Sequence, residues 1–350
     1  MNRPRKTRAA ILTELRKPLV VDEVSLPTTL DVGQVLVEVH YSGICGSQLG
    51  EISGVKGEDK FLPHLLGHEG SGKVIECGPG VRAVNPGDKV VMHWRPGPGI
   101  ESTTPTYVWN GQRINAGRIT TFNEFAVVSE NRLTRIPGDS DMEVAALFGC
   151  AVTTGFGVVV NNAHVRIGDS VVVFGAGGVG LNIVQAAALA GAFQVVAVDL
   201  HDNRLELAQS LGATHLINAS KEDAESTINS ILHSQGLDCF IDNTGHPDII
   251  EMGYRITKAN GRVILVGVPR AGNNISVYSL PLHFGKIVSG SHGGEAIPNL
   301  DIPRYFSMFR SGKIQLRQLI TEKCGLEDIN TAIQRMVRGA LAGRCLVSMK

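Results

Sequence analysis

The stretch Gly175-Ala176-Gly177-Gly178-Val179-Gly180 decides the fold of the second half of this chain. The apolar run Ser170–Phe174 precedes it, and the alanine-rich segment Gly178–Ala190 follows it. Between a strand and a helix, a G-x-G-x-x-G pattern allows a tight turn at its first glycine, close backbone approach to a phosphate at its second and close helix–strand packing at its third. The N–H groups that open the helix, from Gly178 and Val179 onward, then point at the phosphates. We therefore expect a strand, turn and helix that bind a dinucleotide.

Asp199 indicates which dinucleotide is bound. It ends the apolar run Gln194–Asp199 and lies 19 residues beyond Gly180. A carboxylate at this point accepts hydrogen bonds from the adenosine ribose hydroxyls and repels a 2′-phosphate. NAD is therefore favoured over NADP. The alternative is that Asp199 only caps a helix over Asn203–Leu211.

The pattern of apolar residues changes along the chain. After Cys150, apolar strands alternate with helical stretches, which predicts βαβ units and a doubly wound parallel α/β sheet. Between about residues 7 and 140, short alternating or β-branched runs are separated by turn residues, which predicts a β-rich unit. The runs expected to be strands are Gln34–His40, Lys73–Glu76, Asp88–His93 and Glu124–Ser129 in the first part, and Leu237–Asp242 and Arg262–Val268 in the second.

Composition narrows the class of protein. A chain of 350 residues predicts about two domains, and 43% hydrophobic residues suffice for two cores. The 33 basic and 33 acidic residues cancel, so no broad field attracts nucleic acid or a membrane surface. Six cysteines at irregular spacing indicate thiols or metal ligands in a reducing compartment. Because no signal peptide or membrane-spanning run is evident, we expect a cytoplasmic protein.

Three further motifs accompany the glycine pattern. They are Gly43-Ile44-Cys45-Gly46-Ser47, Gly67-His68-Glu69 and Gly149-Cys150-Ala151-Val152-Thr153-Thr154-Gly155. With these motifs the chain resembles the zinc-dependent medium-chain alcohol dehydrogenases over nearly its whole length. The resemblance implies a GroES-like β-rich catalytic domain over residues 1–152 and 291–350. It also implies a Rossmann domain with a doubly wound parallel sheet over residues 153–290.

The resemblance implies that Cys45, His68 and Cys150 bind one catalytic Zn²⁺. Two thiolates and an imidazole suit this ion and leave a fourth position for substrate or water. A single cysteine or histidine is more often a buried structural residue, so the three motif contexts carry this interpretation. Glu69 follows a ligand, and two interpretations stay open. It is either a buried carboxylate that approaches the metal or one partner of an ion pair with a nearby Lys or Arg.

The chain also departs from the pattern of the family. Many members hold a second, structural zinc on four cysteines, but Arg95–Arg118 contains none, so one zinc per chain is expected. Ser47 is followed by Gln48 where members usually carry an acid, and a neutral amide there is expected to weaken the support of the ligand histidine. Gly50 stands where some members relay protons through a histidine. Proton release then depends on Ser47.

Five other residues receive roles from the resemblance. Trp94 matches a position that lines the substrate pocket, with a partly buried core aromatic as the alternative. Arg344 matches an arginine that contacts pyrophosphate, and Arg204 a basic residue beside the adenosine ribose, although either could be a solvated surface charge. Val266 lies where backbone groups hold the nicotinamide amide. Thr154 resembles the residue that packs behind the nicotinamide ring.

These assignments imply hydride transfer between an alcohol and NAD, giving an aldehyde or a ketone. The substrate is a primary or secondary alcohol, which Cys150 favours, or a polyol, sugar or cyclitol, which Trp94, His93 and the polar Arg95–Arg118 loop favour. Two alternatives stay open: a zinc-free NAD(P)H quinone or enoyl reductase, and a non-catalytic dinucleotide-binding protein. We expect a homodimer or homotetramer joined through an edge strand near Asn274–Tyr278, with no nucleic-acid or membrane partner.

Overall fold

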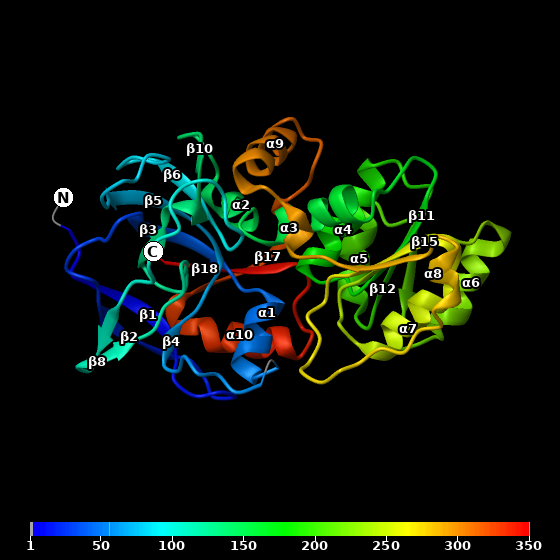
Figure 1. Cartoon of the computed structure of the whole chain (residues 1–350), viewed down its shortest axis with the longest axis horizontal. Helices are drawn as coiled ribbons and strands as arrows, with labels where there is room; N and C mark the ends of the chain where they lie inside the picture. The colour runs from blue at the N-terminus through cyan, green and yellow to red at the C-terminus, as the bar shows by residue number, and fades with distance from the viewer. Residues whose placement is uncertain (1–2, 56, 350) are drawn as a thin grey trace. The chain divides into compact units, whose positions relative to one another are not determined.

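The computed structural model describes residues 3–55 and 57–349, and only the backbone of Ser234. The chain forms two compact units, Met1–Cys150 with Ile297–Lys350, and Ala151–Ala296. The domain boundaries predicted from the sequence are at 152/153 and 290/291. Figure 1 labels the helices and many of the strands of both units. Each unit is described below by itself.

The first unit is built on two β-sheets. One has the strand order β4-β1-β2-β7-β8, and the other has the order β10-β6-β5-β3-β18-β17, with β9 paired to β3. The strands of the first sheet are β1 (Lys6–Leu12), β2 (Val20–Ser25), β4 (His64–Leu65), β7 (Tyr107–Trp109) and β8 (Gln112–Ile114). Those of the second are β3 (Gln34–Gly43), β5 (Glu69–Cys77), β6 (Lys89–His93), β9 (Phe125–Ser129), β10 (Leu133–Ile136), β17 (Ile320–Gly325) and β18 (Arg344–Ser348). The runs predicted as strands in this part are confirmed.

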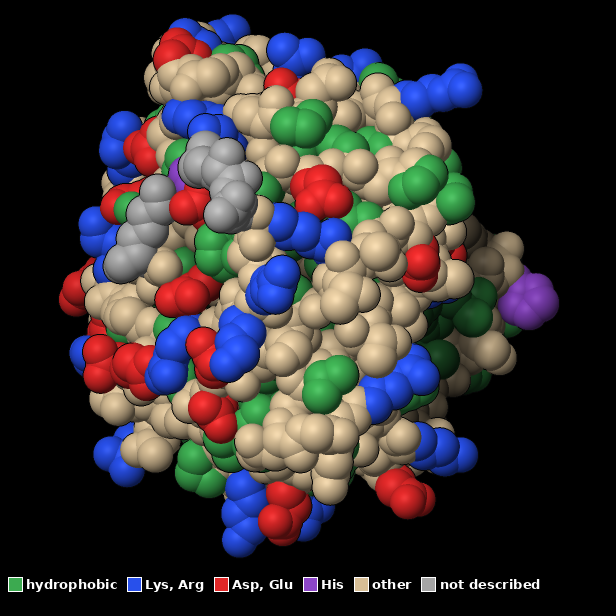
Figure 2. Space-filling model, turned by 90° about the vertical axis from the view of Figure 1, so that its left-hand side faces the viewer, with side chains coloured by type: hydrophobic (Ala, Val, Ile, Leu, Met, Phe, Trp, Pro, Cys, Tyr) green, Lys and Arg blue, Asp and Glu red, His purple; other side chains and the backbone are tan. Residues whose placement is uncertain are grey.

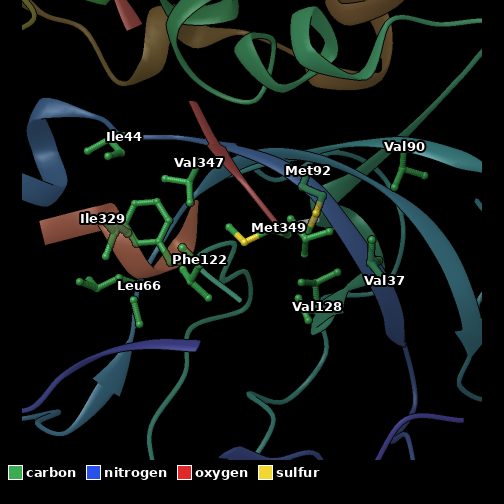
Figure 3. Close-up of a cluster of buried hydrophobic side chains, with 14 of the residues drawn as sticks. Val37, Ile44, Leu66, Val90, Met92, Phe122, Val128, Ile329, Val347 and Met349 are labelled. Carbon is green, nitrogen blue, oxygen red and sulfur yellow. The ribbon is translucent and has the colours of Figure 1, made fainter. Parts of the chain in front are cut away.

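Apolar residues from distant parts of the chain share the core of this unit. Figure 3 shows Phe122 beside Leu66, Ile329 and Val347, and all four side chains are buried. Ile329 comes from α10 (Ile329–Val337), and Val347 from β18 near the end of the chain. The other α-helices of the unit are α1 (Gly46–Ser53), α2 (Met142–Leu147) and α9 (Pro298–Arg310). The C-terminal segment therefore completes the first unit.

The second unit holds one sheet with the strand order β13-β12-β11-β14-β15-β16, and every neighbouring pair is parallel. This order is that of a doubly wound dinucleotide-binding domain, so the predicted α/β class is confirmed. The strands are β11 (Ser170–Phe174), β12 (Gln194–Asp199), β13 (His215–Asn218), β14 (Leu237–Asp242), β15 (Thr257–Leu265) and β16 (Ile287–Gly290). The helices are α3 (Ala151–Gly157), α4 (Gly178–Leu189), α5 (Asp202–Ser210), α6 (Ala224–Leu232), α7 (Pro247–Ile256) and α8 (Leu280–His283).

The edge of this sheet differs from the prediction. The segment Asn274–Tyr278 forms no strand, and the edge strand is β16. The ladder position beside β15 is taken by residues 287–290, with Arg262 opposite Ile287 and Leu265 opposite Gly290. The prediction was wrong because apolar, β-branched residues occur in both segments and only the pairing distinguishes them. Ile287 is 50% exposed at this edge.

Surface charge and helix length agree with the composition. On the face that Figure 2 draws, basic and acidic side chains alternate without a large area of one sign. In the described part of the chain, no helix is long and apolar enough to cross a membrane.

Replacing Phe122 by alanine tests the core of the first unit. Its ring is fully buried, so the change leaves a cavity and is expected to lower the free energy of unfolding by roughly 3–5 kcal/mol. Urea unfolding followed by circular dichroism measures this difference. Phe61→Ala, at a side chain that is 69% exposed, is the control and should stay within about 0.5 kcal/mol. Equal effects of the two changes would contradict this account of the core.

Candidate functional site

Three short connections position the predicted metal ligands. Cys45 is the N-cap of α1, directly after β3, and His68 lies between β4 and β5. Cys150 follows α2, and the residue before it must be small. A Cβ atom at Gly149 would lie 2.3 Å from the carbonyl oxygen of Met92. Close approach of the α2 end to β6 therefore brings Cys150 to the other two residues.

The three side chains meet. The Sγ atoms of Cys45 and Cys150 and a ring nitrogen of His68 all lie within 4.8 Å of one another. Both cysteines are 6% exposed. His68 Nε2 is buried and has no hydrogen-bond partner among the described residues. Two thiols and an imidazole with a free ring nitrogen match the donor set of a catalytic zinc site.

The charges of the two thiols support the same interpretation. A hydrogen bond with Cys150 lowers the pKa of Cys45 despite its burial, and the charge of Arg344 acts in the same direction. The hydrogen bond with Cys45 and burial raise the pKa of Cys150 well above its usual range. The protein alone therefore stabilises one thiolate of the pair. A divalent cation supplies the charge that allows both to ionise.

Gln48 supports the histidine ligand. With its amide oxygen turned to the 67–68 backbone, it accepts from the N–H of Gly67 (2.9 Å), the N–H of His68 (3.1 Å) and His68 Nδ1 (3.2 Å). A proton on Nδ1 leaves the lone pair of Nε2 for the metal. Gln48 is 1% exposed, so water does not compete for this contact. In the sequence, Gln48 is noticeable only because family members usually carry an acid at this position. In the structure, its neutral amide oxygen is the acceptor that supports His68.

Glu69 and Arg344 form a buried ion pair beside the thiols. Glu69 is 0% exposed, and its Oε1 lies 3.4 Å from Arg344 Nε. The Arg344 guanidinium donates to the Ile44 carbonyl oxygen (3.1 Å) and lies 3.8 Å from Cys45 Sγ. The ion-pair alternative for Glu69 is therefore present. Arg344 is 3% exposed, so its interpretation as a surface charge is wrong. Its contact with pyrophosphate stays a prediction.

Two further predicted residues lie in the first unit. Ser47 is in the first turn of α1, and its Oγ is buried without a hydrogen-bond partner in the described part of the chain. Trp94 follows β6 and is partly buried, with the Arg95 guanidinium 5.9 Å from its ring centre. Its place in a substrate pocket stays a prediction. His93 is fully engaged: its ring nitrogens contact the Arg95 carbonyl oxygen and Thr134 Oγ1, and burial lowers its pKa to about 4.

The glycine pattern of the second unit has the expected geometry. Gly175 has a φ of +94°, which favours glycine, and a Cβ atom at Gly180 would lie 1.9 Å from the Gly175 carbonyl oxygen. Gly177 is the N-cap of α4, and no side chain accepts from the first turn of that helix. A Cβ atom at Gly177 would meet nothing within 4 Å. The helix start is therefore open to a pyrophosphate.

Asp199 binds the glycine loop. Its Oδ2 accepts from the N–H of Ala176 (2.8 Å), and its Oδ1 accepts from Leu200 and His201. Arg204 lies 3.6 Å away across an ion pair. The N-cap of α5 is His201, so the alternative in which Asp199 only caps this helix is wrong. Its contact with the ribose stays a prediction.

The remaining candidate residues lie near the carboxyl ends of the parallel strands. Doubly wound sheets bind their ligands at these strand ends. Val266 follows β15 and donates its N–H to the Asp242 carbonyl oxygen (2.8 Å). Thr154 Oγ1 in α3 is buried without a partner among the described residues. So are both amide atoms of Asn243, directly after β14. Sequence analysis missed Asn243, whose position after a buried strand is the signal that could have found it.

Comparison with known proteins agrees with these sites. Two family models match: "Alcohol dehydrogenase GroES-like domain" over residues 31–138 and "Zinc-binding dehydrogenase" over residues 178–310. An S-(hydroxymethyl)glutathione dehydrogenase of Paracoccus denitrificans and a class-3 alcohol dehydrogenase of Cereibacter sphaeroides are each 33% identical, with 95% of this chain and 97% of theirs aligned. The crystal structure of benzyl alcohol dehydrogenase from Acinetobacter calcoaceticus is 27% identical, with a TM-score of 0.88 over 99% of this chain and 100% of that one.

The fold and the two candidate sites are those of a dinucleotide-dependent oxidoreductase in which two thiols and an imidazole lie together. The chain belongs to the zinc-dependent medium-chain alcohol dehydrogenases. It is an NAD-dependent alcohol dehydrogenase with Zn²⁺ and NAD as cofactors, and it acts on small-molecule alcohols and carbonyls. These findings favour that class over the zinc-free reductase and the non-catalytic protein.

Replacing Gln48 by leucine tests its support of His68. The change removes the acceptor for the Nδ1 proton and keeps a similar side-chain length, so the affinity for zinc should fall roughly 10- to 100-fold. A competition titration against a chromophoric chelator measures that affinity. Gln48→Glu keeps an acceptor oxygen and serves as the matched control. If the leucine variant binds zinc as tightly as the wild type, the contact does not orient His68.

Proposed function

We propose that this enzyme oxidises the hydroxymethyl group of a primary alcohol at a zinc ion held by Cys45, His68 and Cys150. The convergence of three donor atoms within 4.8 Å, two of them buried thiols, carries this proposal. The donors leave a fourth position for the substrate oxygen. The site lies wholly in the first unit, and the second unit supplies the nucleotide-binding loop at Gly175–Gly180.

Each residue around the ligands has a defined task. When bound, zinc draws electron density from the substrate oxygen, and NAD accepts the hydride. Ser47 Oγ, buried without a hydrogen-bond partner among the described residues, accepts the proton of the substrate hydroxyl while its own hydroxyl proton passes to solvent water. Gln48 holds His68 in the tautomer that presents Nε2. Arg344 contacts both Glu69 and Cys45 and offsets part of the negative charge that the buried carboxylate and thiolates carry.

The observations favour a primary alcohol over a polyol. Both ring nitrogens of His93 are engaged and the residue is 1% exposed, so this residue has no group to offer to a sugar hydroxyl. The third ligand is Cys150, as in simple alcohol dehydrogenases. The printed names of the compared enzymes, S-(hydroxymethyl)glutathione and benzyl alcohol dehydrogenases, both describe substrates with a CH₂OH group.

A substrate panel tests the proposed class. S-(hydroxymethyl)glutathione and benzyl alcohol should give kcat/KM values at least about tenfold above those of sorbitol and inositol, read as NADH absorbance. Cys45→Ala is the control for the metal: it should abolish turnover while NAD still binds, as measured by calorimetry. A preference for the polyols would overturn the substrate class. Full turnover by a verified zinc-free variant would overturn the role of the metal site.

Ser47→Ala tests the route of the proton. Loss of a positioned proton acceptor typically slows a reaction by roughly 10²- to 10⁴-fold, so kcat at neutral pH should fall within that range. The affinity for NAD should stay the same, because Ser47 lies in the first unit and the glycine loop lies in the second. Ser47→Thr keeps the hydroxyl group and should retain most of the rate. An unchanged kcat in the alanine variant would remove Ser47 from the proton route.

We further propose that the chain acts as a cytoplasmic homodimer or homotetramer joined through β16. This edge strand has unpaired backbone groups, and Ile287 on it is 50% exposed. Phe284, just before the strand, is 68% exposed. An exposed edge with large apolar side chains supports pairing with a second copy through a two-fold axis.

A further inference from the structure

A second group of metal-binding side chains lies in the first unit, outside the cysteine site. Glu51 is in α1, Asp59 is in the loop after it, and His64 opens β4. One ligand atom from each of the three lies within 4.8 Å of the other two. His64 Nε2 is 2.9 Å from Asp59 Oδ2 and 3.9 Å from Glu51 Oε1. The catalytic proposal uses none of these residues.

Both ring nitrogens of His64 face acceptors. Its Nδ1 lies 3.0 Å from the Leu65 carbonyl oxygen, and its Nε2 lies 2.9 Å from Asp59 Oδ2. A metal ion bound between Nε2 and the two carboxylates would take the place of the proton in the His64–Asp59 contact. Metal-binding histidines commonly have this arrangement, with the other ring nitrogen donating to a carbonyl. The His64 side chain is 8% exposed, so water does not readily fill the space between these groups.

Within the described residues, His64 is the basic side chain that contacts the two carboxylates. Over residues 3–55 and 57–349, no Lys or Arg nitrogen lies within 4.0 Å of Glu51 or Asp59. Burial alone would raise the pKa of Asp59, but the Phe61 N–H and His64 outweigh it and lower the pKa. The Phe61 N–H donates to Oδ1 (2.8 Å) and leaves Oδ2 directed at His64. One ring nitrogen and the carboxylate oxygens of two residues therefore converge, and a divalent ion among them would balance the charge of both carboxylates.

We propose that Glu51, Asp59 and His64 form a second metal site that binds a divalent first-row transition ion such as Mn²⁺ or Co²⁺. One imidazole and two carboxylates suit such ions better than Ca²⁺, which prefers a shell of oxygen atoms. Because no thiol is present, the site differs in donor type from the catalytic one. An ion here links α1, the 54–63 loop and β4. These are the elements that connect the ligands Cys45 and His68, so the ion fixes the segment between them.

Manganese binding to the zinc-loaded enzyme tests this site. The probe is Mn²⁺, and electron paramagnetic resonance reports the free ion during the titration. We expect one Mn²⁺ per chain in the wild type and binding at least about tenfold weaker in Glu51→Gln and Asp59→Asn, because each variant loses one ligand charge. Glu58→Gln is the matched control: it removes the same charge from an exposed neighbour of Asp59 and should bind as the wild type does.

Further measurements separate the second site from the catalytic one. Cys45→Ala should lose alcohol oxidation and keep its Mn²⁺, and Co²⁺ bound at the second site should lack the charge-transfer absorption of a thiolate ligand. Glu51 is 43% exposed on α1, so Glu51→Gln tests the proposal even if changes at His64 prevent folding. Equal Mn²⁺ binding by the wild type and Glu51→Gln, or none at millimolar Mn²⁺, would overturn the proposal. In that case the contact between His64 and Asp59 holds these side chains together without an ion.

Discussion

The catalytic unit depends on the mutual compensation of charges buried around Cys45. Arg344 places its guanidinium against the Ile44 carbonyl oxygen, Cys45 Sγ and Glu69 Oε1, and all of these groups are buried. Each charge alone would cost several kcal/mol to remove from water, so each is stable only with the others. Arg344 opens β18, which pairs with β3. The charge balance of the site is therefore complete only when the last strand of the chain joins the sheet.

In the second unit, buried carboxylates hold loops in place by accepting hydrogen bonds from backbone N–H groups. Asp199, at the end of β12, accepts from the N–H of Ala176 and holds the glycine loop. Asp242, at the end of β14, accepts from the N–H groups of Thr244 and Gly245, and burial raises its pKa. Two neighbouring loops are thus tied to strand ends by carboxylates. Asn243 follows Asp242 directly, and its two amide atoms have no hydrogen-bond partner in the described part of the chain. The rigid loops leave polar groups available for a ligand at this edge.

Local patterns predicted what is encoded locally. The glycine loop, the parallel sheet and the three proposed ligands followed from motifs whose residues are close in sequence. The contact between Arg344 and Cys45 spans 299 positions, and no periodicity or spacing reports such a contact. The edge of the parallel sheet was misplaced for the same reason, because only backbone pairing distinguishes β16 from residues 274–278. From the sequence, the missing negative charge of Gln48 predicted weaker support of His68. The structure shows that the Gln48 amide oxygen accepts from three N–H groups, which no sequence pattern reports.

Several of the residues discussed above lie on or beside the short helix α1. At eight residues it is too short to be stable alone, so tertiary contacts determine its position. Its N-cap is the proposed ligand Cys45, its first turns carry Ser47 and Gln48, and Glu51 near its end faces His64. Gln48 binds the backbone that leads to the proposed ligand His68, and His64 lies only four residues earlier in the same segment. The helix is thus joined twice to the 64–68 segment. A displacement of either end would move both the metal ligands and the hydroxyl group that serves them.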